Sequence, residues 1–352
     1  METQIMSPSK RKILLIINCC LLIFGNTGGP LIMRVYFIHG GKRVWLSAWL
    51  ETGGWPIMFI PLIIAYFHRY KNEGSNAKPI LITPRLFLAA AIIGLLTGLD
   101  DYFYAIGVAK LPVSTSALII ATQLGFTALF AFILVKQKFS PYSVNAVVLL
   151  TIGAAVLALH TSTDRPKGVS KKDYFLGFFM TLAAAALYGF VLPLVELTYK
   201  KAKQAISYTL VLEIQLVMCF FATAFCTVGM LINQDFQAIA KESRNFDLGE
   251  ARYYVVLIMC AISWQCFFLG AIGVIFCGSS LLSGILIAVF LPVTEILAII
   301  FFHENFKVEK AVSLVLSLWG FVSYFYGEFR QSKKQKMNSI NQESEKGEFI
   351  AA

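Results

Sequence analysis

The stretch LPVSTSALIIATQLGFTALFAFILV, residues 111–135, decides the fold class. It contains no charged side chain, and a helix needs about 20 consecutive, mostly apolar residues to span a bilayer. The whole chain has the same character: 57% of its 352 residues are hydrophobic and only 14% are charged, with a mean hydropathy of +0.70. A soluble protein carries roughly 25% charged residues. This composition excludes a soluble enzyme, a disordered chain and a secreted disulfide scaffold, and it predicts an all-α integral membrane protein.

Ten apolar segments of spanning length predict ten transmembrane helices. The weakest is the second, in which Glu51 and Gly53-Gly54 interrupt the apolar run. The polar segments at the ends predict a cytosolic N-terminal tail, residues 1–12, and a disordered cytosolic tail, residues 328–352. The predicted spans are 13–34, 44–66, 85–108, 113–135, 141–160, 174–195, 208–231, 253–276, 279–302 and 308–326.

An internal repeat divides the ten predicted spans into two halves. A shift of 167 residues aligns the opening stretch with residues 278–302, so that Ser116 meets Ser283 and Thr127 meets Thr294. Because five spans is an odd number, the halves would cross the membrane in opposite directions, which is how a transporter forms outward-open and inward-open states. The alternative is a coincidence between two apolar hairpins. The predicted units are a first five-helix repeat, 13–160, a connecting loop, 161–173, and a second five-helix repeat, 174–327.

The basic residues predict an orientation. With the N-terminus inside, the cytosolic segments hold 17 of the 30 Lys and Arg residues, so the positive-inside rule predicts that both termini are cytosolic. Arg165, Lys167, Lys171 and Lys172 lie on the outer side in this arrangement and oppose it. Since the basic residues lie in short loops, the net charge of +10 indicates orientation in a bilayer rather than binding to nucleic acid.

The chain has no pattern typical of catalysis or of a bound cofactor. Its seven Cys residues all lie in apolar segments, where we interpret them as packing residues. No His, Cys or carboxylate residues have metal-ligand spacing, and no Gly-rich nucleotide loop or nucleophile elbow occurs. We therefore predict no catalytic residue, no metal and no cofactor.

Four carboxylates lie inside the predicted spans and are the candidates for coupling transport to protons. They share a depth roughly 6 Å outward of the midplane, at 1.5 Å of rise per helical residue. Charge at this depth is costly, and burial among like charges favours the protonated form. The alternative is that Asp100 or Asp101 caps a helix or pairs with Lys110 or Arg34. The candidate proton-coupling residues are Glu51, Asp100, Asp101 and Glu295.

Amide and aromatic side chains near the midplane predict a site for a flat heterocycle. An amide pairs with a donor–acceptor edge, and an aromatic face stacks on a ring. The alternatives are interfacial anchors, core packing and hydrogen bonds between helices. The candidate substrate-binding residues are Asn26, Thr27, Trp55, Tyr102, Tyr104, Gln123, Trp264 and Gln265.

Prolines inside three spans predict interrupted helices that line a cavity. They are Pro30, which follows Gly28-Gly29, Pro193, and Pro292, which precedes Glu295 by three residues. They place the expected site among the first, fourth, sixth and ninth spans.

Five long runs resemble the plant purine permease family of the drug/metabolite transporter superfamily, and the resemblance extends over residues 12–326. It implies ten helices, uptake of adenine, related purines and cytokinins, proton symport and a place in the plasma membrane. The runs are GNTGGPLIMRVYFIHGGKRVW (25–45), WLETGGWP (49–56), LDDYFYAIGVAKLPVSTSALIIATQLGFTALFAFILVKQKFS (99–140), LYGFVLPLVEL (187–197) and LPVTEILAIIFFHENF (291–306).

Together these observations predict a proton-coupled importer of purine-like heterocycles. Its expected partners are a purine-type substrate, protons and the lipid bilayer. Nucleic acid is not an expected partner, and the sequence predicts no particular oligomeric state. One alternative is an organellar exchanger of nucleotide sugars or other metabolites, which would need Lys or Arg at mid-depth to meet phosphate, and no predicted span has either at that depth. A membrane receptor or a membrane enzyme is disfavoured by the inverted repeat and by the missing catalytic cluster.

Overall fold

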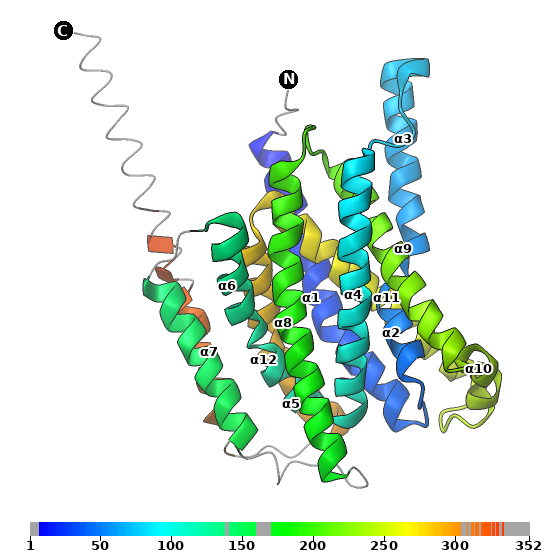
Figure 1. The fold of residues 1–352 in the computed structure, drawn as a ribbon, viewed down its shortest axis with the longest axis vertical. Coiled ribbons are helices and arrows are strands. Elements are labelled where there is room, and N and C mark those ends of the chain that lie inside the picture. The colour runs from blue at the N-terminus through cyan, green and yellow to red at the C-terminus, as the bar shows by residue number, and fades with distance from the viewer. Residues whose placement is uncertain are drawn as a thin grey trace.

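The computed structural model describes residues 7–137, 141–159 and 170–303, and separate positions between 308 and 333. In this part of the chain every regular element is a helix (Figure 1). The elements are α1 (Pro8–Ile38), α2 (Val44–Thr52), η1 (Trp55–Met58), α3 (Phe59–Glu73), η2 (Gly74–Asn76), α4 (Pro84–Lys110), α5 (Val113–Ile120), α6 (Gln123–Val135), α7 (Pro141–Leu159), α8 (Lys171–Lys201), α9 (Tyr208–Ile232), α10 (Asp235–Arg244), α11 (Glu250–Cys277) and α12 (Ser280–Phe302).

Eight helical segments in the described residues are long and apolar enough to cross a membrane. They match the first four predicted spans and the sixth to the ninth, which confirms an all-helical, multi-pass membrane protein. Helix α7 covers the fifth predicted span, and the tenth is described only in part, with an apolar helix at Leu314–Tyr324. The predictions for residues 1–6, 160–169 and 334–352 lie outside the described residues.

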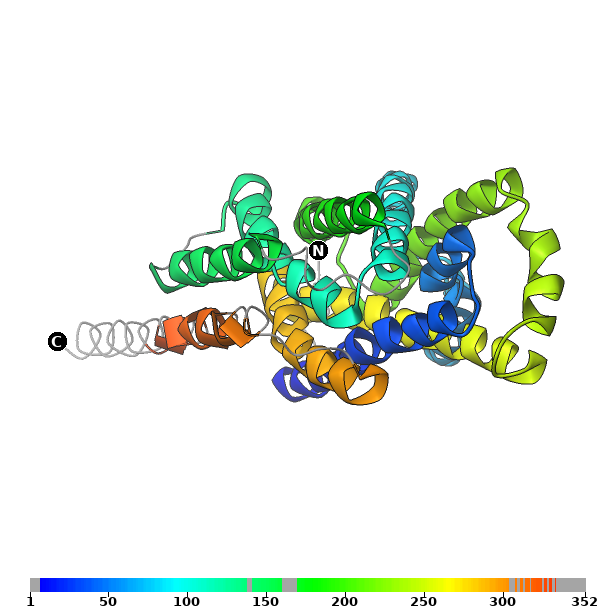
Figure 2. The same ribbon diagram turned by 90° about the horizontal axis from the view of Figure 1, so that it is seen from below.

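The long helices lie side by side and run in alternating directions, as the side view and the end-on view both show (Figures 1 and 2). The most extensive pairings are α1 with α11 and α4 with α8, followed by α4 with α9 and α6 with α8. Where α1 crosses α11, a Cβ atom on Gly25 would meet the backbone of Ser263 and Phe267. Such contact between small residues and backbone is the main source of helix association in lipid, where apolar burial supplies little.

The predicted helix interruptions at the prolines are wrong. Helices α1 and α8 continue through Pro30 and Pro193, and α12 is continuous from Ser280 to Phe302. A proline removes one backbone hydrogen bond, and in a packed bundle a neighbouring helix can satisfy the carbonyl that this leaves. That carbonyl is the one of Asn26 in α1, and it accepts a hydrogen bond from Thr294 Oγ1 at 3.5 Å.

The actual interruptions lie in the second and fourth spans. Helix α2 ends at Thr52, and Gly53-Gly54 lead into the short helix η1 before α3 begins. A Cβ atom on Gly54 would lie 2.6 Å from the carbonyl oxygen of Ala261, so the missing side chain allows α2 to approach α11 closely. In the fourth span, Ala121 and Thr122 separate α5 from α6. Both breaks occur beside residues that line one pocket, Glu51 and Gln123.

Charged side chains gather at the two ends of the bundle. Between residues 7 and 303, every described Lys and Arg lies in a loop or in the first or last turns of a helix. In this part of the chain, the acids that lie at neither end are the four predicted ones, Glu51, Asp100, Asp101 and Glu295. The middle of the bundle therefore carries acidic groups and no basic residue among the positions described.

Candidate functional site

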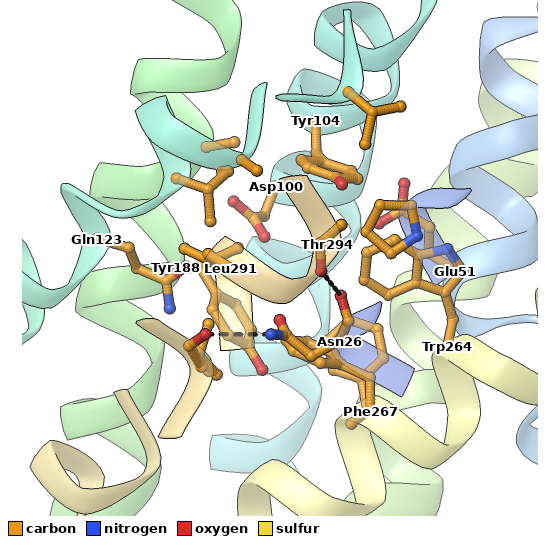
Figure 3. Close-up of a pocket in the computed structure, with 17 residues that line it drawn as sticks. Asn26, Glu51, Asp100, Tyr104, Gln123, Tyr188, Trp264, Phe267, Leu291 and Thr294 are labelled. Atoms are coloured by element: carbon orange, nitrogen blue, oxygen red, sulfur yellow. Dashed lines mark hydrogen bonds between the residues drawn. The ribbon is translucent and has the colours of Figure 1, made fainter. Parts of the chain in front are cut away.

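A pocket of about 590 Å³, with the space at its mouth included, lies in the middle of the bundle. Helices α1, α2, α4, α8, α11 and α12 and the broken span α5–α6 all contribute lining residues. Figure 3 shows Gln123 on one side of the pocket and Glu51 with Trp264 on the other.

Aromatic rings form much of the pocket wall. Trp264 is the centre of the group, because its ring meets Tyr104 edge-on at 5.4 Å between centroids and meets Phe267 edge-on at the same distance. Tyr188 of α8 lies 5.6 Å from Phe267 with the two rings tilted by 33°. All four residues line the pocket and are at least nine-tenths buried. Their rigid faces suit a flat ring as ligand.

Four polar side chains that line this pocket have unsatisfied atoms. Among the described residues, Glu51 Oε1, Asp100 Oδ1, Gln123 Nε2 and Trp264 Nε1 are buried and have no hydrogen-bond partner. An unpaired buried polar atom costs about 1–3 kcal/mol, so four of them in one cavity indicate a place for a polar ligand. The pocket offers carboxylate acceptors on one side and an amide donor on the other.

Asn26 holds α1 against α12 at the pocket. Its side-chain Nδ2 donates to the carbonyl oxygen of Ile287 at 3.1 Å, and its own carbonyl oxygen accepts from Thr294. Pro30 frees that carbonyl, since it lies four residues further along α1 and has no N–H to donate. The proline therefore joins two helices at the pocket without breaking either of them.

Six of the twelve predicted site residues line the pocket. They come from α1, α2, α4, α6 and α11, and Figure 3 labels all of them. These six are Asn26, Glu51, Asp100, Tyr104, Gln123 and Trp264.

Three of the other predicted residues do not line the pocket, and two of them, Trp55 and Tyr102, pack against neighbouring aromatic rings. Trp55 packs against Phe59 and Phe220, at 5.8 and 5.5 Å between ring centroids. Tyr102 stacks on Trp45 at 3.8 Å with an angle of 12° between the rings. Thr27 is half-buried and is not among the residues that line the pocket.

The remaining three are buried close to the pocket without lining it. Asp101 is fully buried beside Thr52, and its charge is close enough to Glu51 for the two groups to interact. Gln265 lies against Gly54 at the break in the second span. Glu295 is fully buried in α12, next to Thr294.

Tyr188 and Phe267 line the pocket, yet sequence reasoning missed them. Tyr188 is near the middle of its span, so the depth argument that selected Trp264 would have selected it too. Phe267 is three residues after Trp264, one helical turn along the same face of α11. A helical-face criterion applied to Trp264 would have included it.

No group of three or more His, Cys, Asp or Glu residues in the described part of the chain could hold a metal ion. All seven Cys residues are free thiols. The pocket therefore has the chemistry of a binding site for an organic molecule, with aromatic, amide and carboxyl groups and no cationic side chain among its lining residues.

Comparison with known proteins decides the family. A family model described as purine nucleobase transmembrane transport matches residues 13–334. Purine permease 3 of Arabidopsis thaliana is 57% identical over 95% of this chain and 96% of its own length, and purine permease 2 of the same plant is 53% identical over 93% and 95%. The chain belongs to the purine permease family. It is a purine transmembrane transporter, and the resemblance seen in its sequence is confirmed.

The more distant relatives of this permease include purine permease 21 of Arabidopsis thaliana, which is 33% identical over 94% of this chain and 85% of its own length. A solved crystal structure of a protein with 13% sequence identity superposes with a TM-score of 0.50 over 88% of this chain and 97% of the other. At that identity the likeness concerns the fold alone.

The contact between Gly29 and Trp264 gives a test of the site. A Cβ atom on Gly29 would lie 2.8 Å from Cε2 of the Trp264 ring, whereas one on Gly28 would meet only Ser263 Oγ at 3.4 Å. Gly29→Ala must therefore displace the indole at a cost of about 1–3 kcal/mol. We expect it to raise the KM for adenine uptake about tenfold.

Gly28→Ala is the matched control on the adjacent position of the same helix. We expect its KM to stay within about twofold of the unmodified permease, since its Cβ makes ordinary contacts. Uptake assays at equal membrane abundance check both variants. Equal KM values for the two would show that Trp264 does not shape the substrate site.

Proposed function

We propose that this permease is a proton-coupled importer of purine-like heterocycles, including adenine and cytokinins, and that the pocket in the bundle centre is its substrate site. The observation that carries the proposal is the set of unsatisfied polar atoms between aromatic walls. A purine has N–H groups that can donate to carboxylates and ring nitrogens that accept from an amide. Of Glu51 and Asp100, one would accept from a purine N–H group, and the other, protonated, would donate to a ring nitrogen. Gln123 would donate to another ring nitrogen.

Stacking would supply the remaining contacts. The face of a purine fits beside Trp264 or Tyr188, and the edges of Tyr104 and Phe267 limit its position. We propose that Thr27, Trp55, Tyr102 and Gln265 contact the substrate in other states of the transport cycle. In this state those four residues do not line the pocket.

Proton coupling rests on the group of acids. Glu51 interacts electrostatically with both Asp100 and Asp101, and the described residues supply no ion pair for any of the three. Close like charges inside a membrane bundle favour a state in which at least one is protonated. We propose that external protonation of Asp100 or Glu51 accompanies purine binding, with Asp101 and Glu295 as further members of the proton path.

We propose that the ten predicted helices form two inverted five-helix repeats, residues 13–160 and 174–327. The pattern of helix pairs supports this assignment. If each span corresponds to the one five places later, the α1–α11 pair corresponds to α8–α4, and these are the two most extensive pairings. Helices α1 and α8 also run in opposite directions (Figure 1). Such symmetry suits alternating access around a fixed central site.

We propose a plasma-membrane location with both termini in the cytosol. The charges at the two ends of the bundle support this orientation. Between residues 7 and 303, the described residues at the end where α1 begins include 11 Lys and Arg and 3 acids, against 9 and 5 at the other end. The end with more basic residues is expected to face the cytosol. The four central acids are then nearer to the outside, where protons would enter.

The rival organellar exchanger of nucleotide sugars has no support from the pocket. Phosphate recognition calls for Arg or Lys, and no basic residue is among those that line this cavity.

Uptake of radiolabelled adenine into cells that lack their own purine transporter tests the transport proposal. Expression of the permease should produce accumulation, and a protonophore should abolish most of it, because dissipating the proton gradient removes the driving force. Adenine and a cytokinin should compete. Accumulation that a protonophore leaves unchanged would contradict proton coupling, and no competition by any purine would contradict the proposed substrate site.

The two adjacent aspartates separate a direct coupling role from an indirect one. Asp100 lines the pocket, whereas Asp101 lies beside Thr52 outside it. An amide has nearly the shape of a protonated carboxyl, so Asp100→Asn should still bind adenine but lose the dependence of uptake on external pH. Asp101→Asn, the comparison variant, should keep part of that dependence, because Asp101 would relay the proton without touching the purine. If Asp100→Asn keeps an unchanged pH profile, Asp100 does not carry the proton.

A further inference from the structure

A second cavity lies at the end of the bundle where α1 begins, between α3, the loop after it and the start of α9. Its space is about 1630 Å³, with the open side included. No residue of α3 is buried, and large apolar side chains such as Ile63, Ile64 and Phe67 are exposed. Figure 1 shows α3 at one edge of the bundle. In a bilayer, lipid must fill a cleft beside such a helix.

The walls of this cleft change from apolar to polar along its length. Pro61, Ile64 and Ala65 of α3 and Leu212 of α9 line the part nearer the membrane centre. His68 and Arg69 lie one turn further toward the end of α3, and Lys78 follows in the loop. This order of surfaces matches a phospholipid, whose acyl chains lie deeper than its phosphate.

The guanidinium group of Arg69 has hydrogen-bond donors that are not paired. Its Nη2 donates to the carbonyl oxygens of Lys78 and Pro79 at 3.2 and 3.4 Å. Among the described residues, its Nε and Nη1 are shielded from solvent and have no hydrogen-bond partner. Lys78 is exposed, and no carboxylate in the described part of the chain lies within ion-pair distance of its ammonium group.

The start of α9 adds further donors to the same rim. Ser207 caps the helix by accepting from Leu210 N at 3.3 Å. The first N–H groups of a helix have no partner within it, and their positive dipole end favours anions. The residues at this position, Tyr208 and Thr209, line the cleft.

Two acids face the basic groups of the cleft, and their negative charges oppose the binding of an anion. Glu73 lines the outer rim of the cleft. Glu213 of α9 interacts with Arg69, but its Oε2 already accepts from the backbone N–H groups of Leu81 and Ile82 at 2.8 and 2.7 Å. The carboxylate of Glu213 therefore holds the loop, and Lys78 with the helix end remains available to an anion.

We propose that this cleft binds one anionic phospholipid, with its phosphate between Lys78, Arg69 and the start of α9 and an acyl chain between α3 and α9. This lipid site does not depend on the proposed purine site, although the helices of the second span join the two sites. Helix α3 continues through η1 into α2, which carries Glu51 into the purine pocket. Lipid in the cleft would hold that helix in place.

Binding of phosphatidylglycerol and phosphatidylcholine to the purified full-length permease, followed by native mass spectrometry, tests the proposal. Phosphatidylglycerol should bind more tightly than phosphatidylcholine, because phosphatidylcholine has no net charge. Lys78→Gln should weaken phosphatidylglycerol about fivefold, the effect of one basic residue at a lipid surface. Excess inorganic phosphate should not displace the lipid, since phosphate has no acyl chain.

Lys71→Gln is the matched control. Lys71 is exposed on the same helix, two residues after Arg69, and does not line the cleft. It should leave the lipid affinity within about twofold of the unmodified chain. Equal losses in the two variants would show a diffuse surface charge and overturn the proposal, as would equal affinity for the two lipids.

The wall of the cleft gives a second readout. Ala65→Phe fills the apolar part without changing charge, and it should weaken both lipids while an unchanged size-exclusion profile shows that the chain is folded. Unchanged lipid binding in this variant would place the lipid elsewhere and overturn the proposal.

Discussion

The burial of carboxylates in the middle of a membrane bundle constrains the rest of this structure. Each such group costs at least about 2.5 kcal/mol when charged near the bilayer centre. Between residues 7 and 303, every described basic residue lies near one or the other end of the bundle, and none lies in its middle. The acids are therefore neutralised by protons or satisfied by a ligand. Both solutions require a cavity beside them, and the helix packing provides it.

Small residues make that cavity possible. Gly25 and Gly29 bring α1 against α11 so closely that the second of them touches the Trp264 ring. Beside this contact, the Trp264 ring meets Tyr104 and Phe267 edge-on, which gives a site for a flat ring. Packing and recognition thus depend on the same few positions.

The depth of a residue along its span could be predicted from the sequence, but the direction in which its side chain points from the helix could not. Counting residues from the midpoint placed Glu51 and Asp100 slightly outward of the midplane and Gln123 and Trp264 near it, and the structure places all four around one pocket. The same count also selected Trp55, which turns toward Phe220 instead. The rotation of a helix about its own axis depends on the helices that pack against it. The sequence of that helix alone does not contain this information.

The prolines show a second limit of sequence reasoning. A proline inside a span predicts a break if its helix is considered alone. In α1 the carbonyl that Pro30 leaves free accepts from Thr294 of α12, so the helix stays continuous and gains a link at the pocket. The actual breaks, at Gly53-Gly54 and at Ala121-Thr122, occur beside Glu51 and Gln123. A glycine pair next to an acid was the better signal.

The central claim is that a purine and a proton occupy the same pocket, and proton uptake on binding tests it directly. Purified permease in a weakly buffered solution near neutral pH should take up about one proton for each adenine bound, because a buried carboxyl becomes protonated as the purine enters. Asp100→Asn should bind adenine with less uptake. Adenine binding with no proton uptake at any pH between mildly acidic and mildly alkaline would contradict the account.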